Sequence, residues 1–235
     1  MIDIHCHILP GLDDGSQSLA ESIEMAQFLV SMGYKKVLAS THIKSGIYNN
    51  TAAIIQKKCE TLQTALDARG IDLKIIPFVE LYLDETVLNK IEAGVIPSYN
   101  NRILVEGPMN NWPDYLDSIL FKIKTKGFSP ILAHVERNRV LNRHPDRIRE
   151  LKDDGVEIQV EALSIVSHYG ESARSCVQEL LKLDLVDYIA TDLHGMPANP
   201  EIFSMAKAEI IQIVGENRWT ELHGKKLEEE VLAWN

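Results

Sequence analysis

Histidines and carboxylates recur in this sequence at one kind of place, directly after short apolar runs. Asp13 and Asp14 lie in the loop after the first run. Imidazole nitrogens and carboxylate oxygens are ligands that Mn, Fe, Co and Zn ions bind in proteins. If the fold brings these positions together, they predict a metal centre. The positions at the ends of six runs are His5 and His7, His42, Glu80, Glu106, His134 with Glu136 and Arg137, and Asp192 with His194.

The apolar runs have the length and composition of buried β-strands, and they alternate with amphipathic helical segments. Such alternation favours a parallel sheet covered by helices. Since no GxGxxG motif follows the first strand, we predict a seven-stranded (β/α) barrel in a single domain over residues 1–235. The expected strands cover residues 2–5, 35–41, 73–80, 102–106, 130–135, 156–162 and 186–192. The expected helices run from a capping box at Ser18 and Glu21 to Gly33, then over 51–70, 85–93, 113–126, 145–154 and 171–184, followed by two closing helices.

In a parallel barrel the carboxyl ends of the strands meet at one rim, where active sites form. Taken singly, each motif has a simpler explanation. An HxH pair near a terminus can be an incidental surface pair, Asp13-Asp14-Gly15 can be an ordinary turn, and Glu80 or Glu106 can be a solvated charge. Five of the eight histidines, however, fall at expected strand ends together with three carboxylates, which chance explains poorly.

Strand geometry adds one local expectation. A side-chain period of two places His5 and His7 on one face of their strand, with Cys6 on the other. The last helix is expected to pack on the barrel through Leu227, Val231 and Trp234. The remaining histidines fall in expected loops or helices and are interpreted as structural or surface residues: His144, His168 and His223.

Composition excludes several classes of protein. Lys and Arg number 24 against 34 Asp and Glu, a formal charge of −10, which argues against nucleic-acid binding because that binding depends on cationic side chains. No apolar run is long enough to predict membrane insertion. The N-terminal residues lack the features of a signal peptide, and three cysteines without CxxC spacing favour a reducing compartment. We therefore expect a cytoplasmic protein.

The sequence lacks the motifs of enzymes that use a cysteine or a serine as the nucleophile. A thiol phosphatase needs an Arg six positions after its Cys, and the residues six positions after the three cysteines are Leu12, Ala65 and Lys182. There is also no GxSxG motif of a serine hydrolase and no Walker-type loop.

The ordered set of motifs resembles a known superfamily. HxH after the first strand, DDG, Thr41-His42, isolated glutamates, HxER and DxH resemble the PHP (polymerase and histidinol phosphatase) superfamily. The segments HILPGLDDGSQS, KSGIYNN and HVERNR are similar to the bacterial manganese-dependent protein-tyrosine phosphatases encoded with capsule and exopolysaccharide genes. The resemblance spans residues 1 to about 200.

This resemblance implies a distorted, TIM-like barrel of PHP type that holds three divalent ions, in the first place Mn²⁺, with Fe, Co and Zn as alternatives. Arg137 would hold the phosphate, and Asp192 or His194 could supply a proton to the leaving group. The implied ligand sets are His5, His7, Glu80 and Asp192 for the first ion, Glu80, Glu106 and His134 for the second, and Asp14, His42 and His194 for the third.

The implied reaction is hydrolysis of protein phosphotyrosine by a metal-bridged hydroxide that attacks phosphorus. The implied partner is a cytoplasmic autophosphorylating tyrosine kinase of polysaccharide export. The oligomeric state is left open.

Three departures from the family pattern stand out. Thr41 directly precedes His42, without the Pro that the family usually has between them, and Val135 replaces Pro in the HxER segment. The segment DLHGMPANP lacks the Arg that usually follows DxH, and Arg139 is a candidate to replace it.

Other functions stay open. The site could serve a PHP phosphoesterase for a small metabolite such as histidinol phosphate, or a phosphodiesterase, because those enzymes would differ mainly at the pocket rim. Residues 44–50 and 108–113, with Tyr48 and Trp112, could form that rim. A metal-binding regulator that releases no phosphate is the non-enzymatic alternative. An amidohydrolase is less well supported, since no counterpart of its modified Lys is evident.

Overall fold

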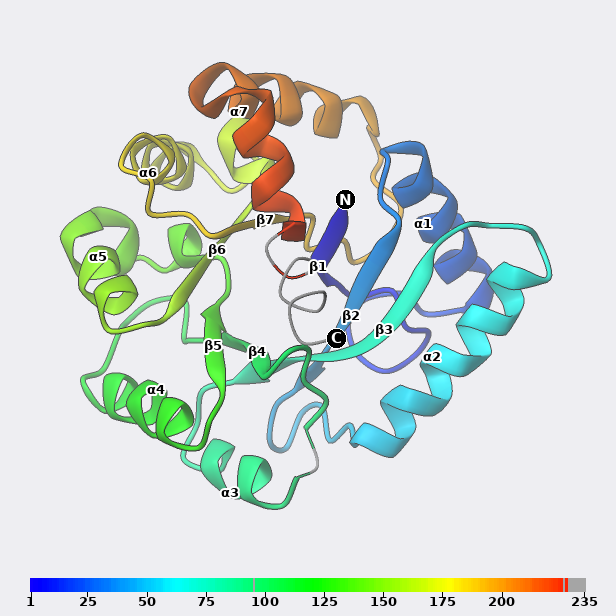
Figure 1. Ribbon diagram of the computed structural model, residues 1–235, viewed down its shortest axis with the longest axis horizontal. Helices are drawn as coiled ribbons and strands as arrows, with labels where there is room; N and C mark the ends of the chain where they lie inside the picture. The colour runs from blue at the N-terminus through cyan, green and yellow to red at the C-terminus, as the bar shows by residue number, and fades with distance from the viewer. Residues whose placement is uncertain (95, 226, 228–235) are drawn as a thin grey trace.

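Strands and helices alternate along the chain in the computed structural model, which describes residues 1–94, 96–225 and 227 (Figure 1). The strands are β1 (Ile2–Cys6), β2 (Lys36–Ile43), β3 (Lys74–Tyr82), β4 (Arg102–Glu106), β5 (Ser129–Leu132), β6 (Glu157–Glu161) and β7 (Tyr188–Ala190). The α-helices are α1 (Leu19–Ser31), α2 (Ala52–Asp67), α3 (Val87–Glu92), α4 (Tyr115–Thr125), α5 (Pro145–Asp153), α6 (Glu171–Lys182) and α7 (Glu201–Thr220).

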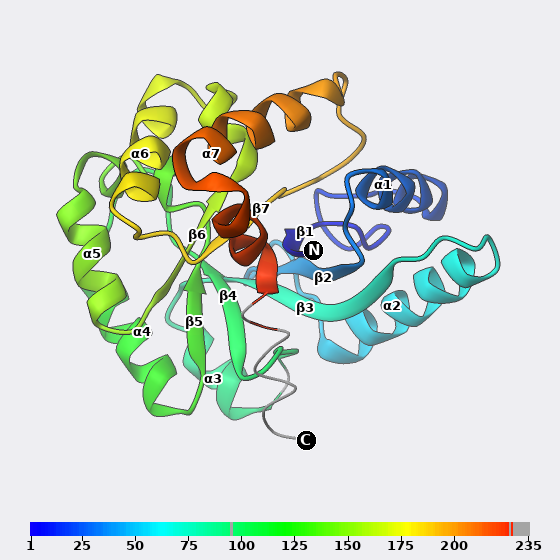
Figure 2. The same ribbon diagram turned by 45° about the horizontal axis from the view of Figure 1, so that its top comes forward.

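The predicted seven-stranded (β/α) barrel is confirmed. The strands pair in sequence order, and every pairing is parallel. The helices surround the sheet (Figures 1 and 2). The first strand approaches the last at the carboxyl end, where the His7 amide donates to the Leu193 carbonyl (3.0 Å) and the Asp192 amide donates to the His5 carbonyl (2.8 Å). The Asp3 carboxylate strengthens this seam by accepting hydrogen bonds from the Thr191 amide (3.1 Å) and hydroxyl (2.6 Å).

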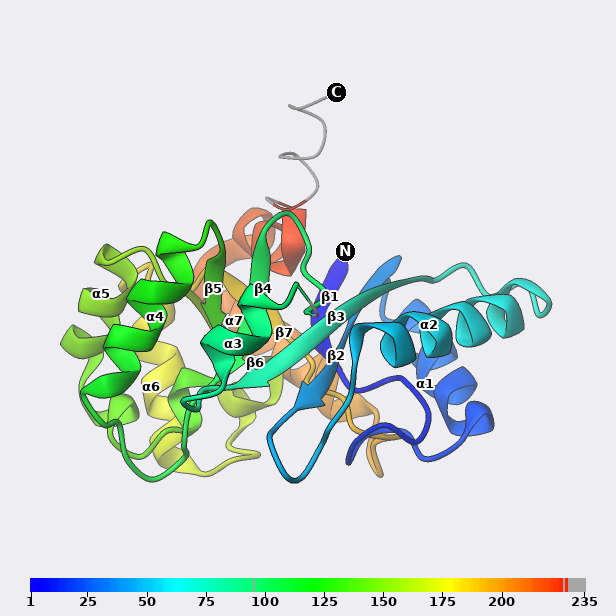
Figure 3. The same ribbon diagram turned by 90° about the horizontal axis from the view of Figure 1, so that it is seen from below.

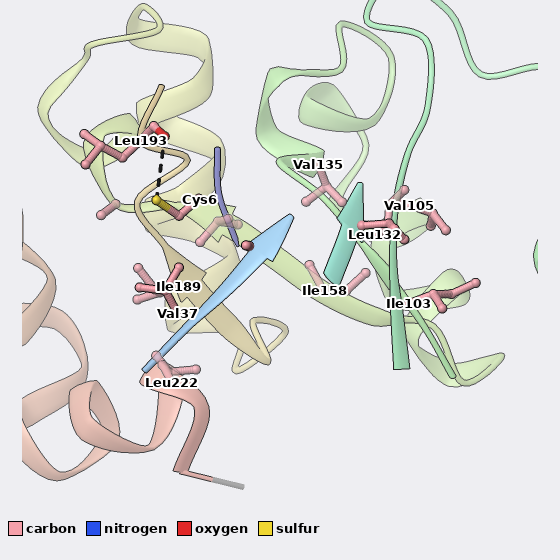
Figure 4. Close-up of a cluster of buried hydrophobic side chains, with 14 of the residues drawn as sticks. Cys6, Val37, Ile103, Val105, Leu132, Val135, Ile158, Ile189, Leu193 and Leu222 are labelled. Carbon is pink, nitrogen blue, oxygen red and sulfur yellow. Dashed lines mark hydrogen bonds between the residues drawn. The ribbon is translucent and has the colours of Figure 1, made fainter. Parts of the chain in front are cut away.

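Both faces of the sheet are buried, as their near-continuous apolar sequences predict. An inner cluster fills the barrel. An outer cluster lies between strands and helices, and Figure 4 shows part of it. The inner cluster consists of Ile2, Ile4, Leu38, Phe78, Leu104, Ile131, Ala133, Tyr188, Ala190 and Leu227. Leu227 therefore packs on the barrel as expected, whereas Val231 and Trp234 lie outside the described residues.

A bulge in β1 positions its two histidines. Asp3 pairs with Val37 and Cys6 pairs with Ala39, so β1 carries one extra residue between these pairs. Cys6 belongs to the outer cluster, while His5 and His7 meet through their Nε2 atoms. The predicted orientation, with His5 and His7 on one side and Cys6 on the other, is thus confirmed. Ile4 points into the inner cluster, and the extra residue of the bulge lets the side chain of Cys6 point to the opposite face, into the outer cluster.

Two strands end two or more residues earlier than predicted. The fifth was expected to reach residue 135 and the seventh residue 192, but His134 (φ 37°) and Asp192 (φ 48°) adopt left-handed backbone conformations that end extended pairing. Such conformations are uncommon for residues other than Gly and cluster at functional sites.

Glycine and capping residues fix the loop that leads into α1. A Cβ at Gly15 would lie 2.3 Å from the His7 Cβ, so only Gly lets the loop pass this histidine. The Ser18 hydroxyl accepts from the Glu21 amide (3.2 Å), as in a capping box. The Glu21 carboxylate, however, accepts from the Gln17 amide (2.8 Å) instead of the Ser18 amide that the sequence predicts.

The closing segment bends at Gly215 (φ 78°) within α7, which corresponds to the two closing helices expected. Figure 3 shows the helices lying to the sides of the strands. Among the described residues, no helix combines the length and apolarity needed to span a membrane.

Candidate metal centre

Nine predicted ligand residues come together at the carboxyl end of the barrel. Their ligand atoms form four overlapping groups, and within each group all atoms lie within 4.8 Å of one another. Seven of the nine line a cleft of about 540 Å³, and His5 and His7 lie beneath it, fully buried. The groups are His7, Asp14, His42 and His194; His5, His134 and Asp192; His5, His7 and Glu80; and His42, Glu80 and Glu106.

Glu80, at the end of β3, is the centre of the cluster. Its Oε2 atom lies 3.2 Å from His5 Nε2, His7 Nε2 and His42 Nδ1. Its Oε1 atom lies 2.9 Å from His134 Nε2. One buried carboxylate therefore faces four imidazoles that come from the carboxyl ends of three strands, β1, β2 and β5.

The hydrogen bonds of His5 and His7 determine which ring nitrogens are free. His5 Nδ1 lies 3.1 Å from Gln159 Oε1, and His7 Nδ1 lies 2.9 Å from Asp13 Oδ2. Both oxygens are acceptors, so the ring protons belong on Nδ1 and the Nε2 lone pairs point away from these partners. The two Nε2 atoms lie only 3.2 Å apart and face Asp192 Oδ1 at 3.0 and 3.3 Å. Converging lone pairs and carboxylate oxygens are the donor set that a divalent cation fits.

Orphaned atoms point to the same need for a cation. His42 Nδ1 and Asp192 Oδ1 are buried without a hydrogen-bond partner. Burial disfavours a charged His5, yet Asp192 and Glu80 raise its pKa well above its usual value. Burial likewise disfavours ionised Glu80 and Asp192, but His5 holds the pKa of both far below the usual range. The buried carboxylates of Glu80 and Asp192 are therefore stable as anions only beside positive charge. Bound metal ions can supply this charge in place of protonated imidazoles.

The group around Asp14 is more open. Asp14 Oδ1 lies 3.6 Å from His42 Nε2 and 3.5 Å from His194 Nε2. The His194 Nδ1 atom lies 2.9 Å from the Asp192 carbonyl, which leaves Nε2 as its free nitrogen. The His194 ring also stacks on His7, with centroids 4.0 Å apart.

Arg137 lies beside the cluster in a fixed position. Its Nη1 atom donates to Glu161 Oε1 (2.6 Å) and to Asp192 Oδ2 (3.2 Å). Its guanidinium lies 4.4 Å from the centroid of the Tyr169 ring. The position lines the cleft, so the group is available to an anionic substrate.

Three partners that hold these residues were absent from the predicted set. Asp13 also accepts from the His42 amide (2.9 Å), and Gln159 also accepts from the His134 amide (3.1 Å). Glu161 ends β6 as Glu80 ends β3, so the strand-end rule could have identified it. Nothing in the sequence distinguishes Gln159 from other buried strand residues.

The predicted rim is correct in part. Tyr48 lines the cleft and stacks on His42, with centroids 5.3 Å apart. Trp112 was a candidate for the rim, but it packs against Gly107 and its indole N–H donates to Asp117 Oδ1 (3.0 Å). Arg139 lines a neighbouring pocket of about 430 Å³ and not the cleft itself.

Metal affinity should depend on pH through Glu106. Burial and the charge of Glu80 raise the pKa of Glu106 to about 7. Below this pH the carboxyl group holds a proton that competes with an ion, so affinity should fall as pH decreases. Between pH 8 and pH 6 one such proton weakens binding about tenfold. Calorimetric titration with Mn²⁺ measures this change, and equal affinity at both pH values would contradict it.

Nearly the whole chain matches one family model. The model is described as capsular polysaccharide synthesis, CpsB/CapC, and it matches residues 1–229. The tyrosine-protein phosphatase YwqE of Bacillus subtilis (strain 168) is 31% identical over 198 residues, which cover 83% of this chain and 78% of YwqE.

Solved structures have the same fold. A crystal structure from a study of YwqE from Bacillus subtilis and CpsB from Streptococcus pneumoniae, described there as unique metal-dependent tyrosine phosphatases, has a TM-score of 0.87 at 29% identity. It covers 94% of this chain and 90% of its own. Histidinol phosphate phosphatase from Lactococcus lactis, complexed with Zn, L-histidinol and phosphate, has a TM-score of 0.59 at 10% identity, covering 91% and 94%, and supports the fold alone.

Proposed function

The chain belongs to the CpsB/CapC family of capsular polysaccharide synthesis, and from this premise we propose that it is a metal-dependent protein-tyrosine phosphatase. The observation that carries the proposal is the convergence of four imidazoles on the buried Glu80 carboxylate, with His42 Nδ1 left without a hydrogen-bond partner among the described residues. A cluster of this composition suits ions that activate water, and Arg137 beside it suits a phosphate.

We assign the residues to three ions within one metallophosphatase unit, residues 1–235. Mn²⁺ is the ion we propose, and Fe, Co or Zn ions suit the same nitrogen and oxygen donors. The distances within the cluster support shared use of Glu80 by the first two ions. The proposed sets are His5, His7, Glu80 and Asp192; Glu80, Glu106 and His134; and Asp14, His42 and His194.

Bound divalent ions would lower the pKa of water and stabilise negative charge on phosphoryl oxygens. Arg137 would bind the phosphoryl group through guanidinium N–H donors, while Glu161 and Asp192 hold it in place. A phenolate leaving group, with a pKa of about 10, needs little protonation. Of the two candidate proton donors, Asp192 and His194, we propose His194 for this step, because His5 holds the pKa of the buried Asp192 carboxylate far below its usual range.

The lining of the cleft favours an aromatic phosphoester over an amine-bearing metabolite. Ile47, Tyr48, Tyr82 and Met109 supply apolar and aromatic surface beside the ligands. Among the described residues that line the cleft, every carboxylate belongs to a proposed metal set. A substrate amine such as that of histidinol phosphate would therefore find no free carboxylate there.

We further propose that the substrate is a tyrosine-phosphorylated protein, namely an autophosphorylating tyrosine kinase of capsule or exopolysaccharide synthesis. A cytoplasmic site of action is supported by three free cysteines, all of them buried, since free thiols suit a reducing compartment.

Competing substrates test the proposal. Protein loaded with Mn²⁺ should hydrolyse a phosphotyrosine peptide with a kcat/KM at least about tenfold above that for histidinol phosphate, the effect of about 1.4 kcal/mol in transition-state binding. Phosphate release measured at several concentrations of each substrate gives the ratio. Faster hydrolysis of histidinol phosphate would identify a metabolite phosphatase, and bound metal without any turnover would identify a non-catalytic regulator.

A further inference from the structure

We propose that Lys44 binds the phosphoryl group of the substrate as the second cation of the cleft. The segment DLHGMPANP, which begins at Asp192, contains no arginine. Among the described residues that line the cleft, only Lys44 and Arg137 are lysine or arginine. This inference rests on the proposed function for the identity of the ester, but its test below does not require turnover.

Most of the charge of Arg137 is already compensated. Its guanidinium contacts two carboxylates, those of Glu161 and Asp192, at 2.6 and 3.2 Å. A doubly charged phosphoryl group near Arg137 would therefore be attracted less strongly than by a free guanidinium group, because Glu161 and Asp192 already offset its positive charge. A second, uncompensated cation would therefore add substantially to the attraction.

Lys44 is such a cation. Within the part of the chain that the structure describes, its ammonium group forms no hydrogen bond or ion pair and lies 3.8 Å from the centroid of the Tyr82 ring. An aromatic face holds an ammonium group without neutralising it. Lys44 is also near the metal ligands, because it lines the same cleft as Glu80 and Glu106.

The two cations approach the cleft from different elements. Lys44 directly follows β2 and lies over the end of β3, whereas Arg137 is anchored to the end of β6 and to the segment after β7. A phosphoryl group at the cluster could thus contact both, as a pair of cations that hold it in one orientation.

The backbone of Lys44 is fixed while its side chain is free to move. Its amide donates to the Tyr48 carbonyl (3.0 Å), and its carbonyl accepts from the Tyr48 amide (2.8 Å) and the Ile47 amide (3.0 Å). The Asn50 side chain ties the same turn to the His42 carbonyl (2.9 Å). A flexible four-carbon stem on this rigid turn lets the ammonium group leave Tyr82 for a phosphate.

Inorganic phosphate and metal-loaded protein test the proposal. Lys44→Met should raise the dissociation constant of phosphate, measured calorimetrically with the Mn²⁺-loaded protein, by roughly tenfold to a hundredfold, the range for a lost charge-assisted hydrogen bond. Lys44→Arg should restore most of the affinity. Lys57→Met removes the same charge from an exposed position on α2 and should leave affinity unchanged.

Several outcomes would overturn the assignment. The first is an unchanged affinity of Lys44→Met for phosphate. The second is loss of bound Mn²⁺ from that variant, which would place Lys44 in the metal centre. The third is phosphate binding that is weakened in Arg139→Met but not in Lys44→Met. With a phosphotyrosine peptide, Lys44→Met should raise KM by a similar factor. If the wild-type protein binds phosphate through Lys44 but releases none from the peptide, the proposed function fails and the role of Lys44 stands.

Discussion

Replacing Glu80 with glutamine is expected to lower phosphatase turnover by at least about a hundredfold, equivalent to about 2.7 kcal/mol in the activation barrier. Glu80 is the residue on which His5, His7, His42 and His134 converge, at distances of 2.9 to 3.2 Å. Glutamine keeps the size of the side chain but removes the negative charge and one strong ligand oxygen. The variant should therefore bind fewer ions, which elemental analysis after dialysis would measure alongside phosphate release.

A matched variant separates this effect from a general loss of acidity. Glu85 is exposed in the connection between β3 and α3, and Glu85→Gln should retain both metal and turnover. Wild-type turnover in Glu80→Gln would exclude Glu80 as a bridging ligand. Reduced turnover with a full complement of ions would instead assign it a role other than metal binding.

Removing the ions should lower the melting temperature of the protein substantially. Ions that bind only the folded chain stabilise it by mass action, by about 2.7 kcal/mol for each ion present at 100 times its dissociation constant. For a chain of this size that corresponds to about 5–10 °C in Tm per ion. Differential scanning calorimetry before and after treatment with a chelator measures the shift.

The same experiment on Glu80→Gln provides the control, since a variant with fewer ions should lose less of its Tm on chelation. An identical Tm for the chelated and the Mn²⁺-loaded wild-type protein would contradict a metal centre formed by this cluster. Re-addition of Mn²⁺ should restore the original Tm, because removal leaves the ligand residues in place.

The fold and the convergence of the candidate ligand residues could be predicted from sequence because both depend on local patterns. Buried parallel strands have continuous apolar sequences, so a polar residue directly after such a run, like Glu80 or Glu106, marks the rim of a barrel. Convergence follows from topology alone and needs no knowledge of side-chain conformations.

Features that depend on partners distant in sequence could not be predicted in this way. The Gln159 amide orients His5 from 154 residues away, and the pattern of β6 alone does not reveal it. The ends of β5 and β7 were placed too late because His134 and Asp192 adopt left-handed conformations set by the surrounding structure. The sequence places Lys44 in a loop, and only the structure shows that its ammonium group lies beside Tyr82 in the cleft, with no hydrogen-bond or ion-pair partner among the described residues.

Phosphate release from a phosphotyrosine peptide by metal-stripped protein, measured before and after reloading with Mn²⁺, tests the central claim most directly. We expect release only after reloading, and equal release from protein whose thiols have been alkylated, because Cys6, Cys59 and Cys176 are buried and take no part in the reaction. Release by the stripped protein, or its loss on alkylation of the metal-loaded protein, would contradict a metal-dependent phosphatase.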